Sequence, residues 1–159
     1  MMRRYLWIAI VVGVLDQLTK FVIADYLEQR EEVNLMLFLS LRLVHNTGAA
    51  FGFLSSAGGW QNIFFIIIAL LACAVILWLI WRLETKDTLL ASGLTLVLGG
   101  AAGNLTDRLI HGYVIDFIDF HYRTWHWPVF NVADSAITVG AVLLVIDALG
   151  SGSPKKKTL

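Results

Sequence analysis

The sequence contains few charged residues for its length, and their signs balance. Asp, Glu, Lys and Arg make up 15% of the 159 residues, with twelve basic residues against twelve acidic ones. Nucleic acids are bound through clustered positive charge, so a chain without a basic surplus gives no general signal for that partner. The charged fraction is also too low for an ordinary soluble domain, in which about a quarter of the residues are charged.

Cysteine and proline are scarce as well. Cys73 is the only cysteine, which excludes an intramolecular disulfide, and it lies in an apolar stretch where it is expected to act as a small hydrophobic residue. Three histidines, His111, His121 and His126, fall in one segment without the spacing of H-E-x-x-H or a comparable zinc motif. The sequence therefore gives no support for a metal site.

Hydrophobic residues, in contrast, make up 58% of the chain, and the mean hydropathy is +0.73. Such a composition indicates an integral membrane protein, in which each spanning helix needs about 20 apolar residues. We predict an all-α membrane fold, a four-transmembrane-helix bundle, as a single domain over residues 1–150 with a basic cytoplasmic tail at 151–159. The predicted spans cover about 5–27, 60–81, 88–110 and 133–149.

The distribution of basic residues predicts the orientation of these spans. If the chain crosses four times, one side carries Arg3, Arg4, Arg82, Lys86, Lys155, Lys156 and Lys157. The opposite side carries only Arg30, Arg42 and Arg123. By the positive-inside rule both termini are then cytoplasmic, and the two longer loops, 28–59 and 111–130, face outward.

The two outer loops differ in character. Residues 33–44 form an apolar run without helical periodicity, which predicts a small extracytoplasmic β or extended element. The second loop is rich in aromatic residues that are typical of the lipid headgroup region, namely Tyr113, Tyr122, Trp125 and Trp127. This aromatic loop is interpreted as an interfacial belt.

Polar residues inside the first and third spans need partners, because an unpaired charge in a bilayer is costly. Asp16 and Lys20 are four positions apart, so they share a helix face and can pair. Asn104 and Arg108 have the same spacing, and Arg108 is expected either to reach the interface or to fix a carboxylate. Asp107 is expected to face away from the helix surface that carries Asn104 and Arg108.

The acidic residues of the last third suggest a chemical site. Asn131 is a candidate helix cap at the start of the fourth span, whereas Asp134 lies too far in for capping to explain it well. Asp116 lies among apolar neighbours, which raises a carboxyl pKa, and a second carboxylate nearby raises one of the two further. Such a dyad can supply both a base and an acid to hydrolysis. Asp119 competes with Asp116 for this role.

These features leave three classes of function open. Intramembrane Asp, Lys and Arg also mark ion paths, so a small proton- or ion-coupled transporter subunit is the alternative to an enzyme. A transporter is expected to show inverted repeats or broken helices near the midplane, and none is visible here. A structural membrane protein would explain the spans but leave the acidic pair unexplained.

Five motifs, in order along the chain, resemble those of lipoprotein signal peptidase, the bacterial signal peptidase II family. They are D-Q-x-x-K at 16–20, N-x-G-A-A-F at 46–51, G-G-x-x-G-N-x-x-D-R at 99–108, G-Y-V-I-D-F at 112–117 and F-N-V-A-D-S at 130–135. Each motif alone is weak, but the five together on a four-span chain are highly specific.

The resemblance implies an intramembrane aspartyl endopeptidase of the bacterial inner membrane, with its active site toward the outer face. Its substrates are diacylglyceryl-modified prolipoproteins, cut just before the lipidated cysteine. Besides substrate and membrane lipid no partner is implied; no metal or organic cofactor is expected, and the protein is expected to be a monomer. The catalytic pair would be Asp116 and Asp134. The residues implied to bind substrate or support the site are Asn46, Gly48, Asn104, Arg108, Asn131, Asp16 and Lys20.

Overall fold

The computed structural model describes residues 5–48, 58–84 and 87–151 of the chain. These residues form four long helices: α1 (Leu6–Leu27), α2 (Trp60–Arg82), α3 (Thr88–Ile110) and α4 (Val132–Ser151). The four predicted spans are therefore confirmed to within two residues at each end. The basic residues at 3–4, 86 and 155–157, on which the orientation argument partly rests, lie outside the described residues.

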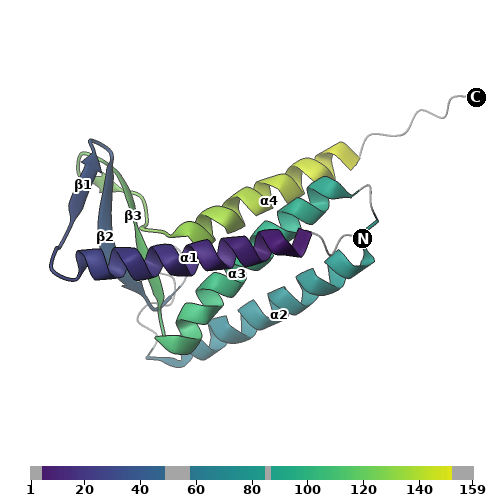
Figure 1. Cartoon of the computed structure of the whole chain (residues 1–159), viewed down its shortest axis with the longest axis horizontal. Helices are drawn as coiled ribbons and strands as arrows, with labels where there is room; N and C mark the ends of the chain where they lie inside the picture. Colours follow the sequence, from purple (N-terminus) through teal and green to yellow (C-terminus); the bar gives the residue numbers. More distant parts are fainter. Residues whose placement is uncertain (1–4, 49–57, 85–86, 152–159) are drawn as a thin grey trace, which may run out of the picture.

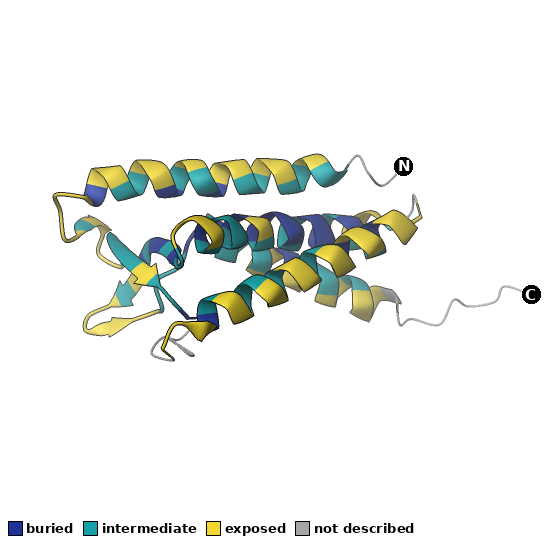
Figure 2. Ribbon diagram, turned by 90° about the horizontal axis from the view of Figure 1, so that it is seen from below, coloured by how far each residue is buried: buried dark blue, intermediate teal, exposed yellow. Residues whose placement is uncertain are grey.

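Helix α3 is the centre of the bundle and packs against each of the other three helices. Figure 2 shows it as the most buried helix, while the outward faces of the others are exposed. Small residues make this close packing possible. A Cβ on Gly99 would lie 2.8 Å from the carbonyl oxygen of Ala9 in α1, and one on Gly140 in α4 would lie 2.7 Å from that of Gly93. Glycine at such positions lets helix backbones approach closely in a membrane.

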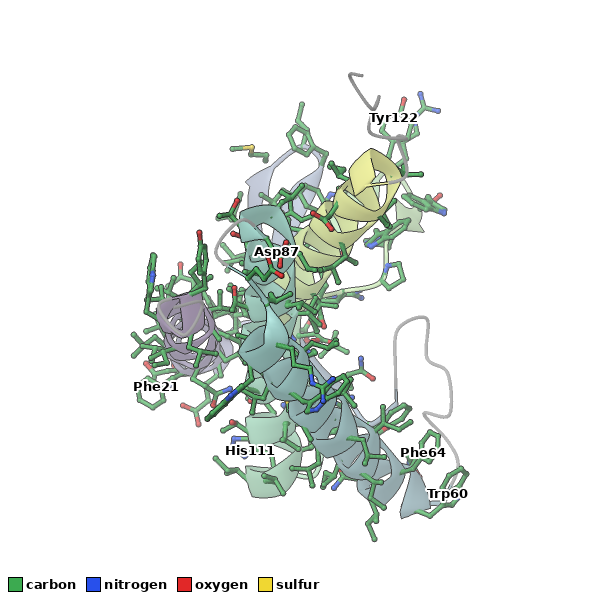
Figure 3. All side chains as sticks on the ribbon, turned by 90° about the vertical axis from the view of Figure 1, so that its right-hand side faces the viewer. Phe21, Trp60, Phe64, Asp87, His111 and Tyr122 are labelled. Atoms are coloured by element: carbon green, nitrogen blue, oxygen red, sulfur yellow. The ribbon has the colours of Figure 1, made fainter. Side chains whose placement is uncertain are left out.

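The outer surface of the bundle is strongly apolar. Figure 3 shows Phe21, Trp60 and Phe64 pointing away from the helices, and Phe21 is 74% exposed. An apolar surface of this extent would drive aggregation of a soluble protein. All four helices are long and apolar enough to cross a membrane, so lipid explains the exposed surface.

An antiparallel sheet lies at one end of the bundle, and the start of α1 and the end of α4 lie at the other (Figure 1). Its strands are β1 (Val33–Met36), β2 (Leu39–Asn46), β3 (Val114–Tyr122) and β4 (Trp125–His126), in the order β1-β2-β3-β4. The extended element predicted at 33–44 is confirmed as β1 and β2. Most of the aromatic loop at 111–130 also forms strands, β3 and β4, which were not predicted from the sequence.

Pairing between β2 and β3 brings together residues that are 68 to 81 positions apart in the sequence. Val44 pairs with Asp116, and Asn46 pairs with Val114. The register shifts between Leu41 and Val44, so the pairing is irregular beside Asp116. This non-local pairing places Asn46 and Asp116 at the end of the bundle where α4 begins.

Candidate active site

Asn131 and Asp134 cap the start of α4 reciprocally. The Oδ1 atom of Asn131 accepts a hydrogen bond from the backbone N–H of Asp134 at 2.9 Å. In return, Oδ2 of Asp134 accepts one from the backbone N–H of Asn131 at 3.2 Å. The predicted cap at Asn131 is confirmed. Asp134, for which capping was expected to be a poor explanation, takes part in the same cap. The pair resembles a capping box, which satisfies two free backbone donors at once.

Asn131 also contacts the carboxylate of Asp116, which comes from β3. Its Nδ2 donates to Oδ1 of Asp116 at 2.7 Å. The second carboxylate oxygen, Oδ2, accepts a hydrogen bond from Nδ2 of Asn46 in β2 at 2.9 Å. Asp116 and Asn131 are almost completely buried. One asparagine thus contacts both Asp116 and Asp134, and holds these two carboxylates in one site.

Asn104 of α3 completes the polar network. Its Nδ2 donates to Oδ1 of Asp134 at 2.8 Å, and its Oδ1 accepts from Nδ2 of Asn131 at 3.1 Å. The same oxygen accepts from Nζ of Lys20 at 3.0 Å. Amides from three separate elements therefore surround the two carboxylates, which is the arrangement that keeps buried polar groups satisfied.

The environment of Asp116 raises the pKa of its carboxyl group to about 7, mainly because burial disfavours the charged form. The nearby charge of Asp134 raises this pKa further, while the hydrogen bonds from Asn46 and Asn131 oppose the shift. A pair of this kind holds one proton near neutral pH and titrates jointly. It can therefore offer a carboxylate and a carboxylic acid at the same time.

A buried ion triad lies next to the network. Nζ of Lys20 lies 2.8 Å from Oδ2 of Asp16, as the four-residue spacing predicted, and 2.7 Å from Oδ2 of Asp107. The expectation that Asp107 faces away was wrong: Asp107 is buried and also accepts a hydrogen bond from Gln17 at 2.7 Å. Oδ1 of Asp16 accepts from the backbone N–H of Ala133 at 2.9 Å, which ties the triad to the start of α4.

Arg108 contacts the chain next to the second motif. Its Nη2 donates to the carbonyl oxygen of Gly48 at 3.0 Å, while the backbone N–H of Gly48 donates to Oδ1 of Asn46 at 3.0 Å. Its guanidinium also lies over the ring of Phe65, 5.1 Å from the centroid. Among the described residues, Arg108 thus orients the backbone that follows Asn46. The rest of that motif, at 49–51, lies outside the described residues.

Asp119 is not part of this site. Its carboxylate is fully buried and lies 3.3 Å from Nε of Arg42 and 2.9 Å from Nδ1 of His126. The proposed competitor of Asp116 therefore has partners of its own. Sequence reasoning also missed Gln17, although its place in the first motif between Asp16 and Lys20 was a usable signal.

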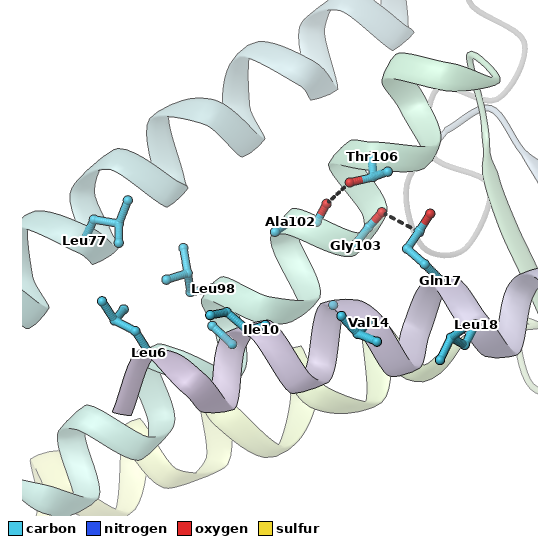
Figure 4. Close-up of a pocket in the computed structure, with 12 residues that line it drawn as sticks. Leu6, Ile10, Val14, Gln17, Leu18, Leu77, Leu98, Ala102, Gly103 and Thr106 are labelled. Atoms are coloured by element: carbon cyan, nitrogen blue, oxygen red, sulfur yellow. Dashed lines mark hydrogen bonds between the residues drawn. The ribbon is translucent and has the colours of Figure 1, made fainter. Parts of the chain in front are cut away.

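An apolar groove of about 670 Å³ runs between α1, α2 and α3, on the side of α1 that carries Leu6, Ile10 and Val14. Figure 4 shows Gln17 at one end of this groove, where its Nε2 donates to the carbonyl oxygen of Gly103. The groove lining is almost entirely apolar. None of the described residues that line this groove is acidic, basic, a histidine or a cysteine, so this lining contains no titratable group.

Four apolar helices, with two amide-bound carboxylates at the end that carries the sheet, define a multi-pass membrane protein with a buried acidic site. Residues 8–150 match the family described as signal peptidase (SPase) II. The chain belongs to the signal peptidase II family.

Relatives that match over most of their length agree with this assignment. The chain is 45% identical to the lipoprotein signal peptidase of Alteromonas mediterranea, over 97% of this chain and 85% of the relative. It is 51% identical to that of Cupriavidus pinatubonensis, over 91% of this chain and 82% of the relative. The proteins that carry this name are peptidases, so the transporter alternative is not favoured.

Two solved structures share the fold. Both are described as bacterial membrane enzymes, and each is 31% identical to this chain. One superposes with a TM-score of 0.87 over 98% of this chain and 93% of the other, and the second with a TM-score of 0.80 over 94% of each. The four-helix membrane fold with its small antiparallel sheet is thus that of known bacterial membrane enzymes.

Proposed function

We propose that this protein is an intramembrane aspartyl endopeptidase that removes the signal peptide from diacylglyceryl-modified prolipoproteins. It hydrolyses the peptide bond just before the lipidated cysteine. The observation that carries the proposal is the position of Asn131, whose side-chain amide donates to the carboxylate of Asp116 and whose backbone N–H donates to that of Asp134. Membership of the signal peptidase II family supports the reaction class, and the names of the relatives support the substrate.

The two carboxylates share the acid and base roles. One takes a proton from a water molecule, whose oxygen attacks the carbonyl carbon of the scissile bond. The other, which still carries its proton, donates to the carbonyl oxygen as negative charge develops there. As the tetrahedral intermediate collapses, the C–N bond breaks and the carboxyl group that took the proton from water gives it to the leaving amine. The other carboxylate takes back a proton from a hydroxyl of the gem-diol, which restores the starting pair. The raised pKa of Asp116 supports one proton on the pair at the start of the cycle.

The amides and the ion triad serve positioning roles in this proposal. Asn46 and Asn131 hold the carboxylate of Asp116, and Asn104 holds that of Asp134. Arg108 orients the backbone at Gly48, where an extended substrate would pass. Lys20 links α1 to α3 through its ion pair with Asp107, and Asp16 links α1 to the start of α4 through the backbone N–H of Ala133. No metal or organic cofactor takes part in these steps.

The site is proposed to face the outer side of the bacterial inner membrane, with both termini in the cytoplasm. In this orientation the cleavage site of an exported signal peptide arrives at the end of the bundle that carries the sheet. The acyl chains of the substrate can stay in the bilayer beside the apolar helix faces. The working unit is proposed to be a monomer built from the single domain at 1–150.

The proposal is tested by cleavage of a purified prolipoprotein in detergent micelles, with diacylglyceryl-modified and unmodified substrate side by side. The enzymes are wild type, Asp116→Asn and Asp134→Asn. Asparagine keeps the shape and an acceptor oxygen but cannot act as acid or base. We expect wild type to cut only the lipidated substrate, and both variants to lose cleavage by about a thousandfold or more.

Asp25→Asn is the matched control, because Asp25 lies in the exposed last turn of α1. Folding of every variant is checked by thermal unfolding in the same detergent. If both site variants fold and still cut, Asp116 and Asp134 are not the catalytic pair. If wild type cuts the unmodified substrate equally well, the proposed requirement for the lipid is wrong, although the protein is still a peptidase.

A further inference from the structure

The hairpin of β3 and β4 brings two histidines and an aspartate to one place. His121 pairs with His126 and Tyr122 pairs with Trp125, which leaves Arg123 and Thr124 as the turn. Arg123 has a φ of 56°, the left-handed conformation that tight hairpin turns require. Asp119 precedes His121 by two positions, so the alternation of a strand places both on one face. His126, opposite His121, falls on that face as well.

The donor atoms of this cluster are close enough for a shared ligand. One ligand atom from each of Asp119, His121 and His126 lies within 4.8 Å of the others. Around a tetrahedral ion with bonds of about 2.0–2.2 Å, ligand atoms lie about 3.3–3.6 Å apart. The ring centroids of the two imidazoles are 5.2 Å apart, and small side-chain rotations would bring the ligand atoms to this tetrahedral spacing.

Unpartnered polar atoms gather around the same cluster. The described residues contain four buried side-chain nitrogen or oxygen atoms without a hydrogen-bond partner, and three of them belong to His121, Ser40 and Arg42. The unpartnered atom of His121 is Nδ1. Ser40 pairs with Asp119 across β2 and β3 and is fully buried. Buried polar groups are rarely left unpaired, and Nδ1 of His121 is the one of these three atoms that suits a metal ion.

We propose that Asp119, His121 and His126 form a binding site for a single Zn²⁺ ion on the β3–β4 hairpin, separate from Asp116 and Asp134. Two imidazoles and one carboxylate are the donors that suit zinc, with a water molecule as fourth ligand. Ser40 pairs with Asp119 across the strands and its hydroxyl has no hydrogen-bond partner among the described residues, so it is free to turn toward the carboxylate when an ion is bound, as partners of ligating carboxylates do.

Arg42 limits the affinity of this site. Its Nε lies 3.3 Å from Oδ2 of Asp119, so its positive charge opposes a bound cation. The side chain of Arg42 is 41% exposed and its Nε is not aligned for a hydrogen bond to Asp119. The guanidinium can therefore turn toward solvent when an ion enters. Without an ion, Arg42 and His126 are the groups that face the buried charge of Asp119.

A bound ion would stabilise the β3–β4 hairpin close to the proposed catalytic pair, since Asp119 lies three residues after Asp116 in β3. A bound ion would link β4, which contributes only Trp125–His126, to the longer β3. Zinc binding should therefore raise the thermal unfolding midpoint of the protein, because a ligand that binds only the folded state stabilises it.

The test uses full-length protein in detergent, with any histidine tag removed, titrated with Zn²⁺ against a chromophoric chelator. We expect one Zn²⁺ per wild-type chain, and binding weaker by about tenfold or more in His126→Gln and in His121→Gln. His126 is 40% exposed, so its substitution is expected to leave the fold intact. The control is His111→Gln, an exposed histidine outside the cluster, with Cys73 present in every variant.

A second measurement is the unfolding midpoint with and without Zn²⁺. We expect a rise in wild type and in His111→Gln, and no rise in His121→Gln or His126→Gln. Mg²⁺ at the same concentration should have no effect, because it prefers oxygen ligands in octahedral geometry. The proposal is overturned if wild type binds no stoichiometric zinc, or if the two cluster variants bind it as tightly as His111→Gln does. Neither measurement depends on peptidase activity.

Discussion

Nζ of Lys20 lies 2.7 Å from Oδ2 of Asp107, although Lys20 belongs to α1 and Asp107 to α3. Both side chains are almost completely buried, and the lysine also pairs with Asp16 at 2.8 Å. One lysine therefore neutralises part of the charge of two carboxylates. The same nitrogen donates to Asn104, so the triad holds both α3 and the amide that binds Asp134.

The first prediction concerns Lys20→Met, which keeps the length of the side chain and removes its charge. Two buried carboxylates would then lack their cation, and leaving buried charges unpaired costs about 3–5 kcal/mol. We expect a loss of unfolding free energy of that order, with loss of cleavage because Asn104 is released. The unfolding free energy is measured by denaturant titration in mixed micelles.

Asp107→Asn is the matched comparison for Lys20→Met. It leaves one lysine with one aspartate, and the remaining amide oxygen can still accept from Gln17 or from the backbone N–H of Ile115. Its cost should therefore be clearly smaller than that of Lys20→Met. Equal costs for the two variants would show that charge balance does not govern this triad.

The triad also shows which contacts could be predicted from the sequence and which could not. Helix periodicity predicted the spans, and the four-residue spacing predicted the pair of Asp16 and Lys20, because both are local properties of one helix. Asp107 could not be placed, because its partner lies 87 positions earlier on another helix and only the packing of α1 on α3 brings them together. The site residues were named through their motifs, whereas their contacts depend on tertiary structure.

The β3 strand was missed for a related reason. Its sequence is largely apolar and aromatic, and an aromatic loop at a membrane interface has the same composition. The burial pattern does not alternate regularly, since Asp116 and Phe117 are both buried and adjacent. The backbone N–H groups of Phe117 and Ile118 both donate to the carbonyl of Phe130, which accounts for the irregularity. A strict alternation search cannot find such a strand.

The second prediction concerns Gly100→Ala in α3. A Cβ at Gly100 would clash with the carbonyl oxygen of Ala133 and lie 2.7 Å from Cγ1 of Ile137, both in α4. The backbone at Ala133 cannot move freely, because its N–H donates to Asp16. We expect a loss of about 1–3 kcal/mol in unfolding free energy, as overpacking typically gives.

Gly13→Ala is the control for Gly100→Ala. A Cβ at Gly13 would have its nearest contact at 3.8 Å, with the carbonyl oxygen of Gly99. Alanine also favours the helix over glycine, so this variant should be neutral or slightly more stable. The stabilities of the two variants are compared with that of wild type by thermal unfolding in the same detergent. A destabilised Gly13→Ala variant would contradict the packing of α1 on α3.

The third prediction separates the two roles of Asn131. Asn131→Ser keeps a hydroxyl that can cap α4 but removes the amide that donates to Asp116. We expect a loss of stability of about 1–3 kcal/mol, which comes from the buried acceptors that lose the amide and not from the cap, because serine is a good cap. Cleavage should fall about a hundredfold or more, since Asp116 loses a positioning contact. The two quantities are measured on the same preparation.

Asn131→Ala completes this comparison because it removes both the cap and the amide. Its activity should resemble that of Asn131→Ser, while its stability should fall by about 1–2 kcal/mol more. If Asn131→Ser cleaves like wild type, the contact between Asn131 and Asp116 has no part in the reaction. If the two variants are equally stable, the capping role is wrong.

The last prediction concerns the pH dependence of cleavage. The carboxyl group of Asp116 has a pKa raised to about 7, first by burial and then by the charge of Asp134. If the pair works with one proton, that proton is present below about pH 7 and is lost as the pH rises through this value. The value of kcat/KM should therefore fall on the alkaline side, with an apparent pKa that belongs to the pair.

Asn46→Ala tests this pH prediction, because the variant should shift the pKa of Asp116 in a known direction. The amide of Asn46 donates to Oδ2 of Asp116 at 2.9 Å and stabilises the ionised form, so its hydrogen bond lowers the pKa of Asp116. Without it the pKa rises, and the alkaline limb of the kcat/KM profile should move to higher pH, even if the maximum rate also falls. The profile is measured from about pH 5 to 9 on lipidated substrate for both enzymes. An alkaline limb that stays in place, or moves to lower pH, would mean that the proton lost in this range does not belong to the pair of Asp116 and Asp134.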